Sequence, residues 1–168
     1  MINELLWLFF LSMFPIFELR WSIPIGILHE VKGVPFLGTV QGFALDPVLV
    51  FFVCVIANII AGIIVYFCLS KFLHFVLRYN SFEKIYNKLV LRAQKNSKKL
   101  IEKYGLIGLA LFISIPFPGT GAWTGALVAH FLGISFKKFT IACILGVTLA
   151  GIMVTLLSIG AFSFFGFI

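Results

Sequence analysis

Two long stretches of this sequence contain no Asp, Glu, Lys or Arg: residues 47–70, with 24 residues, and residues 139–168, with 30. A membrane-spanning α-helix needs about 20 consecutive apolar residues. Each stretch is therefore long enough to cross a membrane once. The whole chain is 61% hydrophobic and only 11% charged, whereas a soluble domain is about 25% charged. We therefore expect an all-α integral membrane protein, and the composition excludes an ordinary soluble domain.

A third uncharged stretch, residues 104–136, is too long for one crossing. Its 33 residues include two prolines and two glycines between positions 116 and 121, and a proline interrupts a helix because it lacks an amide donor. The stretch is either one kinked crossing or a re-entrant hairpin of two half-helices. A fourth stretch, residues 5–17, is too short to cross and predicts the first arm of another hairpin. It lacks the features of a cleaved signal peptide, so we expect it to be retained.

Positive charge favours the hairpin over the kinked crossing. Residues 71–103 contain nine of the 13 basic residues and two of the six acidic ones, which accounts for the whole net charge of +7. Such a segment is expected on the cytoplasmic side of a membrane. Lys137 and Lys138 share that side only if residues 104–136 form a hairpin. Nucleic-acid binding is a poor explanation of the charge, because apolar stretches flank the basic segment on both sides.

The basic segment has a helical pattern of its own. Its cations recur every three or four residues, at Lys84, Lys88, Arg92, Lys95 and Lys99. Apolar residues such as Phe82 and Leu89 lie between them, so the pattern predicts a basic amphipathic helix that contacts anionic lipid headgroups. A solvated linker that only sets the membrane topology explains the charge equally well.

The sequence also contains an internal repeat. The pair Ala61-Gly62 corresponds to Ala150-Gly151 at an offset of 89 residues. Three further correspondences have an offset of about 100: Gly26 with Gly125, Gly33 with Gly133, and Phe36 with Phe136. Each half then consists of one re-entrant hairpin and one transmembrane helix, in opposite orientations, with both termini outside. Inverted repeats with broken helices are typical of transporters, whose sites lie near the membrane midplane.

This arrangement divides a single membrane domain into three segments. They are a first repeat (1–70), a basic cytoplasmic segment (71–103) and a second repeat (104–168). Two crossings are few for a monomer that must enclose a pathway, so we expect a homodimer.

The most informative polar stretch is residues 18–26, which we expect at the tip of the first hairpin, before a second arm that ends near Gly33. Glu18 and Arg20 lie two residues apart between apolar segments, followed by Ser22 and Pro24. Ionisable groups inside a membrane are costly and usually functional. Glu18 could accept a proton, and the planar guanidinium of Arg20 suits a phosphate or carboxylate. Alternatively, the two side chains simply pair with one another.

The second polar stretch interrupts residues 104–136. Its candidate site residues are Pro118, Gly119, Thr120, Gly121, Trp123 and Thr124. The glycines let backbone amides approach a ligand, and the amino end of the following half-helix attracts an anion. Asn58, in the middle of the first span, is expected to bond a hairpin loop or to touch the substrate. His29 and His130 lack the neighbours of a metal site, and no catalytic arrangement is present, so we expect no metal, no cofactor and no enzyme.

Two motifs carry a resemblance to a known family. E-x-R-x-x-I-P-x-G begins at Glu18, and P-x-P-G-T-G-A-W-T-G begins at Pro116. Together they resemble the small multi-drug export family, which is similar to the DedA superfamily and its VTT-domain lipid scramblases. The spacing of Asn58, Gly62 and Tyr66 is also similar to the span that follows the first DedA hairpin. In one respect the chain departs from that pattern, because its second hairpin carries no arginine.

The DedA resemblance implies translocation of a lipid phosphate such as undecaprenyl phosphate, the lipid carrier of cell-wall synthesis. In that hypothesis Arg20 and the amides of residues 119–121 hold the headgroup, and Glu18 couples the movement to protons. One alternative is a proton-coupled exporter of cationic hydrophobic drugs, with Glu18 as the binding group and Trp21 and Trp123 as aromatic surfaces. A second alternative is a membrane assembly or scaffold protein. We expect a multi-pass protein of a prokaryotic plasma membrane.

Overall fold

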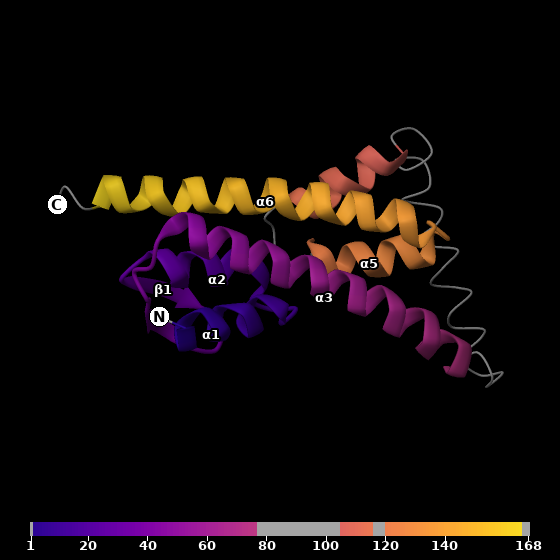
Figure 1. The fold of residues 1–168 in the computed structure, drawn as a ribbon, viewed down its shortest axis with the longest axis horizontal. Helices are drawn as coiled ribbons and strands as arrows, with labels where there is room; N and C mark the ends of the chain where they lie inside the picture. Colours follow the sequence, from indigo (N-terminus) through magenta and orange to yellow (C-terminus); the bar gives the residue numbers. More distant parts are fainter. Residues whose placement is uncertain (1, 77–104, 116–119, 166–168) are drawn as a thin grey trace.

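The computed structural model describes residues 2–76, 105–115 and 120–165 (Figure 1). Its elements are α1 (Ile2–Met13), α2 (Glu18–Ile27), β1 (Glu30–Val34), β2 (Gly38–Gln41), α3 (Pro47–Val76), a helix at Gly105–Ser114, α5 (Ala122–Phe131) and α6 (Phe136–Phe165). The described chain is therefore mostly helical, as predicted. Pro118, Gly119 and nearly all of the basic segment lie outside the described residues, and so does its predicted amphipathic helix.

Within α3 and α6 lie the two segments expected to cross the membrane. Pro47–Leu69 has 23 residues with a mean hydropathy of 3.1, and Phe136–Gly160 has 25 residues with a mean hydropathy of 2.3. Both are longer than the roughly 20 residues that a crossing requires. Less than half of each segment is buried by the rest of the protein. Their outer faces expose large apolar side chains, among them Phe52, Ile64, Leu149 and Leu156, as contact with lipid requires.

The shorter helices form two hairpins that approach each other from opposite ends of the molecule (Figure 1). α1 runs inward and α2 runs back toward the end where both chain termini lie. The helix at Gly105–Ser114 runs inward from the other end, and α5 returns to it. The break between these last two helices lies where the prolines predicted it. The turns of the two hairpins meet beside the middle of α3.

Residues 18–26 were expected to form the tip of the first hairpin, but they form helix α2. Pro24 lies inside this helix and deprives it of one backbone hydrogen bond, to the carbonyl of Arg20. Seven of the ten residues in α2 are buried, and this packing outweighs the loss. The tip consists instead of residues 14–17, which follow α1.

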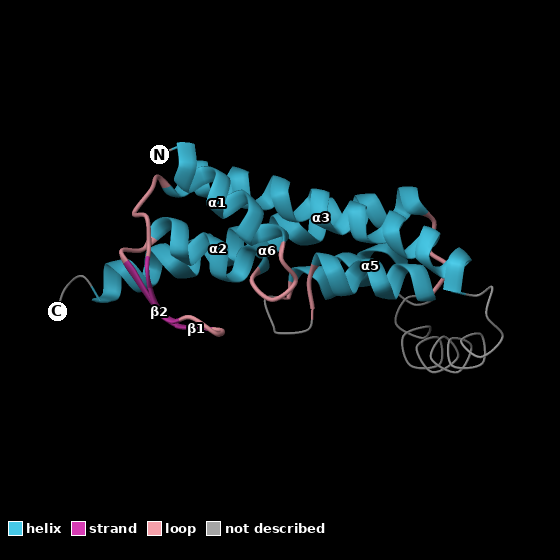
Figure 2. Ribbon diagram, turned by 90° about the horizontal axis from the view of Figure 1, so that it is seen from below, coloured by secondary structure: helices cyan, strands magenta, loops and turns pink. Residues whose placement is uncertain are grey.

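A small antiparallel sheet takes the place of the predicted end of the first hairpin. Figure 2 shows β1 and β2 at one end of the molecule, with Val31 paired to Val40. Helix α2 ends at Ile27, whereas the sequence predicted an arm that continued to Gly33. Gly33 and Gly38 have φ angles of 76° and 69°, which glycine adopts without strain. They let the chain reverse between the strands.

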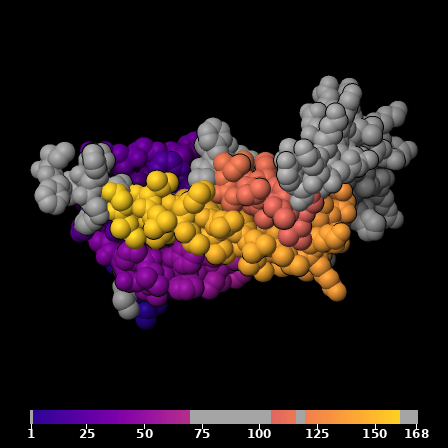
Figure 3. Space-filling view, turned by 90° about the horizontal axis from the view of Figure 1, so that it is seen from above, coloured from indigo at the N-terminus to yellow at the C-terminus, as the bar shows by residue number. Residues whose placement is uncertain are grey.

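Glycines allow the long helices to approach closely, as the sequence predicted for Gly62 and Gly151. A Cβ atom on Gly151 would lie 2.6 Å from a methyl carbon of Val55, and one on Gly62 would lie 3.1 Å from the Cβ of Ala122. Small residues have this role in membrane helix pairs generally. Figure 3 shows a further contact between two helices on another face of the molecule, where α6 lies along the helix at Gly105–Ser114.

Candidate functional site

Glu18 lies where the turns of the two hairpins meet. It is only 4% exposed, and its Oε1 accepts a hydrogen bond from the backbone N–H of Trp123 at 3.5 Å. A Cβ atom on Gly121 would lie 2.8 Å from the carboxyl carbon of Glu18. The first N–H groups of a helix have no partner within it and carry partial positive charge. The amino end of α5 therefore binds the Glu18 carboxylate.

The backbone of Glu18 is itself unusual. Its φ angle is 44°, in the left-handed region that residues other than glycine rarely adopt. Such conformations cost about 1–3 kcal/mol and persist only where surrounding contacts impose them. In this case the contacts are those of the carboxylate with α5 and of α2 with the protein interior.

Arg20 also connects the two hairpins, because its guanidinium donates hydrogen bonds to backbone oxygens of the second one. Its Nη2 donates to the carbonyl of Thr120 and, at 2.9 Å, to the Thr120 hydroxyl. It also lies 3.5 Å from the carbonyl oxygen of Ile115, which accepts a further hydrogen bond from the Thr120 hydroxyl at 2.5 Å. The distance from Nη2 to Glu18 Oε2 is 3.7 Å. Glu18 and Arg20 therefore form only a loose ion pair with each other, and both bind the second hairpin.

Burial raises the pKa of the Glu18 carboxyl to about 7, although the charge of Arg20 and the N–H of Trp123 lower it. Helix α2, which begins with this residue, is too short to span a membrane. With a pKa near 7, both the ionised and the neutral carboxyl are populated around neutral pH. The ionised form is the one that the amino end of α5 and the guanidinium attract.

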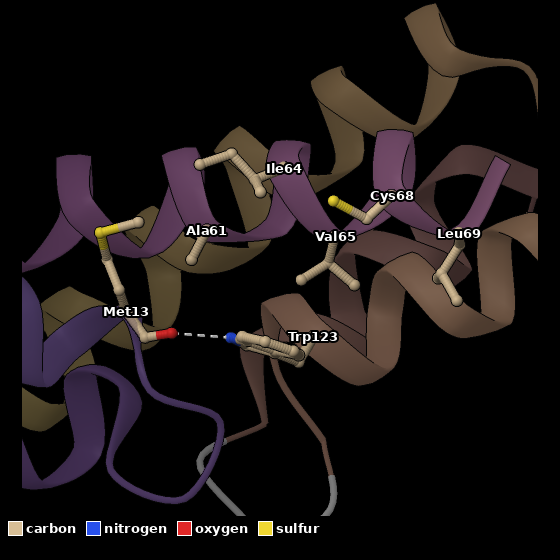
Figure 4. A pocket seen from close by; sticks show the side chains of 7 residues that line it. All are labelled: Met13, Ala61, Ile64, Val65, Cys68, Leu69 and Trp123. Carbon is tan, nitrogen blue, oxygen red and sulfur yellow. Dashed lines mark hydrogen bonds between the residues drawn. The ribbon is translucent and has the colours of Figure 1, made fainter. Parts of the chain in front are cut away.

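Trp123 connects this contact to an apolar cavity. Its indole N–H donates to the carbonyl oxygen of Met13 at 3.0 Å (Figure 4). Beside it lies a cavity of about 310 Å³ between α3, the end of α1 and the start of α5. The lining residues are Met13, Ala61, Ile64, Val65, Cys68, Leu69 and Trp123. Trp123 thus contacts Glu18 through its backbone and lines the cavity with its ring.

Comparison with protein families agrees with this geometry. The family model described as "Putative small multi-drug export protein" matches residues 18–153, which is well over half of the chain. The chain belongs to this family. The match begins at Glu18 and ends within α6, so it includes the residues of this site except Met13 and leaves out the first turn, residues 14–17. The family's name refers to small multi-drug export, and together with the two long apolar helices it makes the chain a membrane protein of transport type.

Two other comparisons gave no match. Neither a curated protein nor a solved structure is significantly similar to this chain.

The structure brings together five of the site residues predicted for the small multi-drug export chain. These are Glu18, Arg20, Thr120, Gly121 and Trp123. The other described candidates lie farther from this contact. Ser22 donates to the backbone carbonyl of Glu18 one turn earlier, Thr124 donates to the carbonyl of Gly121 at 3.4 Å, and Pro24 lies a turn beyond Arg20. Asn58 is on α3, and its Oδ1 has no hydrogen-bond partner in the described part of the chain.

Sequence reasoning did not identify the groups that complete the site through their backbone carbonyls. Met13 accepts the indole N–H, and Ile115 accepts from Arg20 and Thr120. The last carbonyls of a helix are unpaired within it, and Pro15 indicates in the sequence that α1 ends near Met13. That signal could have identified Met13, and Pro116, which directly follows Ile115, gives the same signal for the second carbonyl.

The unfolding free energy of this protein is expected to fall as the pH rises from 4.5 to 7. The ordinary pKa of Glu is 4.5 and the value of Glu18 is about 7, so between these limits the folded state keeps a proton that the unfolded state releases. The contribution is fully present below pH 4.5 and is lost as the pH rises through 7. It amounts to roughly 3 kcal/mol. Thermal unfolding in detergent at stepped pH values measures it, and an unchanged pH dependence in Glu18→Gln would contradict the assignment.

Proposed function

We propose that this chain is a proton-coupled exporter of small hydrophobic compounds, in which the protonation state of Glu18 controls the contact between the two hairpin turns. The observation that carries the proposal is the burial of an ionisable carboxylate between those turns. The ionised group binds the amino end of α5 and lies beside Arg20. The neutral group loses most of both attractions, whereas burial disfavours the ionised group. Proton binding and the position of this carboxyl are therefore thermodynamically linked.

We further propose that both hairpins are re-entrant and that the two halves form an inverted repeat. Corresponding glycines in the two hairpins have similar surroundings, which supports this arrangement. A Cβ on Gly26 would contact Leu8 of the first hairpin in addition to Val50 of α3, and one on Gly125 would contact Ile113 of the second hairpin. The chain would then be a multi-pass protein of the cell membrane, with residues 71–103 against anionic lipids on the cytoplasmic side. A homodimer would help to enclose the pathway.

The cavity beside Trp123 supports an apolar substrate. Its volume of about 310 Å³ is at the lower end of small-molecule sites. None of the described residues that line it is charged, so they offer nothing to compensate the desolvation of a cationic drug. An uncharged aromatic compound suits the cavity better than the cationic compounds considered from the sequence. Because Trp123 also contacts Glu18, an occupant that displaces its ring would affect the carboxylate contact.

Transport by the purified chain in liposomes tests this function. Liposomes that contain the protein in their membrane are loaded with an uncharged fluorescent compound, and a pH gradient is imposed across the membrane. We expect release that depends on the gradient and stops when a protonophore collapses it. Release that is the same in protein-free liposomes, or is unaffected by the protonophore, would overturn the proposal.

The second candidate function is translocation of a lipid phosphate of the DedA type. It is favoured by the convergence of Arg20, the Thr120 hydroxyl and the amino end of α5, which are all suitable ligands of a phosphate. In the structure the Glu18 carboxylate fills the place of such an anion. A phosphate headgroup could therefore bind only after Glu18 has been protonated and has moved away.

Binding of a polyprenyl phosphate distinguishes the two candidates. At pH 8 we expect the wild type to bind it within about twofold of neutral polyprenol, and Arg20→Ala to leave the ratio unchanged, because the ionised carboxylate already occupies the anion ligands. Native mass spectrometry at pH 8 and pH 5.5 measures both lipids. A tenfold preference for the phosphate at pH 5.5 that is lost in Arg20→Ala would favour the lipid-phosphate function.

A further inference from the structure

Asn58 is a buried polar residue that the contact between the turns does not use. It lies near the middle of α3 and is 1% exposed. Its Oδ1 has no hydrogen-bond partner among the residues that the structure describes, a property it shares only with Thr155 Oγ1. A buried acceptor without a donor is costly, and more so in a helix that crosses a membrane. Such a group suggests a partner that is present in another state of the protein.

The neighbours of Asn58 on α3 place it at the level of the two turns. One helical turn before it, the carbonyl of Cys54 accepts a hydrogen bond from Ser12, next to the end of α1, at 2.9 Å. One turn after it, Gly62 packs against Ala122 at the start of α5. Residues four apart share a helix face and lie about 6 Å apart along the axis. Asn58 therefore lies on this face between the end of the first hairpin arm and the amino end of α5.

Neutral Glu18 needs a kind of partner that its observed neighbours do not supply. A protonated carboxyl has an O–H group that must donate to an acceptor. The N–H of Trp123 and the guanidinium of Arg20 are both donors. Of the two unpaired buried acceptors in the described chain, Thr155 is 12 residues from Cys143 on α6, or about 18 Å along the helix. Cys143 is the residue of α6 that interacts electrostatically with Glu18, so Thr155 is too distant.

We propose that Asn58 Oδ1 accepts a hydrogen bond from the O–H of neutral Glu18, so that the carboxyl binds α5 when ionised and α3 when protonated. This inference rests on the proposed function, because it supplies the second position of the proton-linked switch. The titratable groups that bear on Glu18 are Arg20 on α2 and Cys143 on α6. On the other packed helices the described titratable groups are Cys54, which is fully buried one turn before Asn58 on α3, and the more distant Tyr66, Cys68, Glu4 and His130.

The experiment is infrared difference spectroscopy of the full chain in lipid between pH 5 and pH 8. The C=O stretch of a protonated carboxyl that disappears in Glu18→Gln is assigned to Glu18, and its intensity gives the titration midpoint. Asn58→Leu keeps nearly the same volume and removes the acceptor, and Asn58→Gln keeps an amide acceptor. Thr155→Val is the matched control, because it removes the other unpaired polar atom.

In Asn58→Leu we expect the midpoint to fall by about one pH unit, a tenfold loss of proton affinity, because one hydrogen bond to the neutral form is lost. The band should move to higher wavenumber, and Asn58→Gln should partly restore both values. If Asn58 only made the surroundings more polar, Leu would raise the midpoint instead. A raised or unchanged midpoint, or an equal change in Thr155→Val, would overturn the inference. If proton-driven transport still depends on Glu18, that result leaves the proposed function standing.

Discussion

Replacing Glu18 by Gln is expected to abolish export driven by a pH gradient. Gln has nearly the same size, and its amide oxygen can still accept the N–H of Trp123. It cannot bind or release a proton, and it carries no charge for Arg20 to attract. If Glu18 is the coupling group, flux in liposomes should lose its dependence on the pH gradient. A gradient of one pH unit changes the proton occupancy of a carboxyl about tenfold, so we expect the flux to fall at least about tenfold.

An acid on the surface provides the control for this variant. Glu30, at the start of β1, is exposed, and Glu30→Gln makes the same chemical change away from the two turns. We expect its flux to equal that of the wild type. Both variants should elute as folded protein from size-exclusion chromatography. Gradient-dependent flux at the wild-type level in Glu18→Gln would refute proton coupling through this residue.

The membrane helices were predictable because they depend on local composition. A stretch without charges that is longer than a bilayer is thick has few alternatives to a spanning helix, and α3 and α6 lie where those stretches predicted them. The break before α5 was predictable for a similar reason, since a proline acts on the helix that contains it. The sheet of β1 and β2 was missed because its strands have only five and four residues, too few to give a clear alternation of apolar and polar positions.

The contact between the turns was only partly predictable. The sequence identified Glu18, Arg20, Thr120, Gly121 and Trp123 as candidates, because polar groups and glycines stand out in apolar surroundings. It assigned the amino end of α5 to a substrate anion, whereas the structure places the Glu18 carboxylate there. The pattern shows that a helix end attracts an anion but not which anion reaches it. That choice depends on how segments about 100 residues apart pack together.

Gly121→Ala is expected to destabilise the protein more than any other substitution of a single small residue at these turns. Gly121 has φ 124° and ψ −166°, a conformation that is nearly exclusive to glycine and costs other residues about 1–3 kcal/mol. The added Cβ would also displace the carboxylate, which loses a charged hydrogen bond of about 1.5–3 kcal/mol. A total loss of about 3 kcal/mol should lower the Tm by roughly 10 °C for a chain of this size.

Gly160→Ala is the matched control for this variant. A Cβ atom on Gly160 would have no neighbour within 4 Å, and the residue lies inside helix α6. Its unfolding free energy should stay within about 1 kcal/mol of the wild type, because Ala is the better helix former. Thermal unfolding in the same detergent measures both variants. A Tm of Gly121→Ala equal to that of Gly160→Ala would contradict the close contact between Gly121 and Glu18.

A double-mutant cycle separates the two causes of this loss. In a Glu18→Ala background the added methyl group no longer meets a carboxylate, so only the backbone cost at Gly121 remains. We expect Gly121→Ala to cost at least about 1 kcal/mol less in that background, a coupling typical of residues in direct contact. Equal costs in both backgrounds would mean that the φ angle alone requires glycine. The glycine would then shape the loop without holding the carboxylate against α5, and Glu18 could leave that position without opening the contact between the turns.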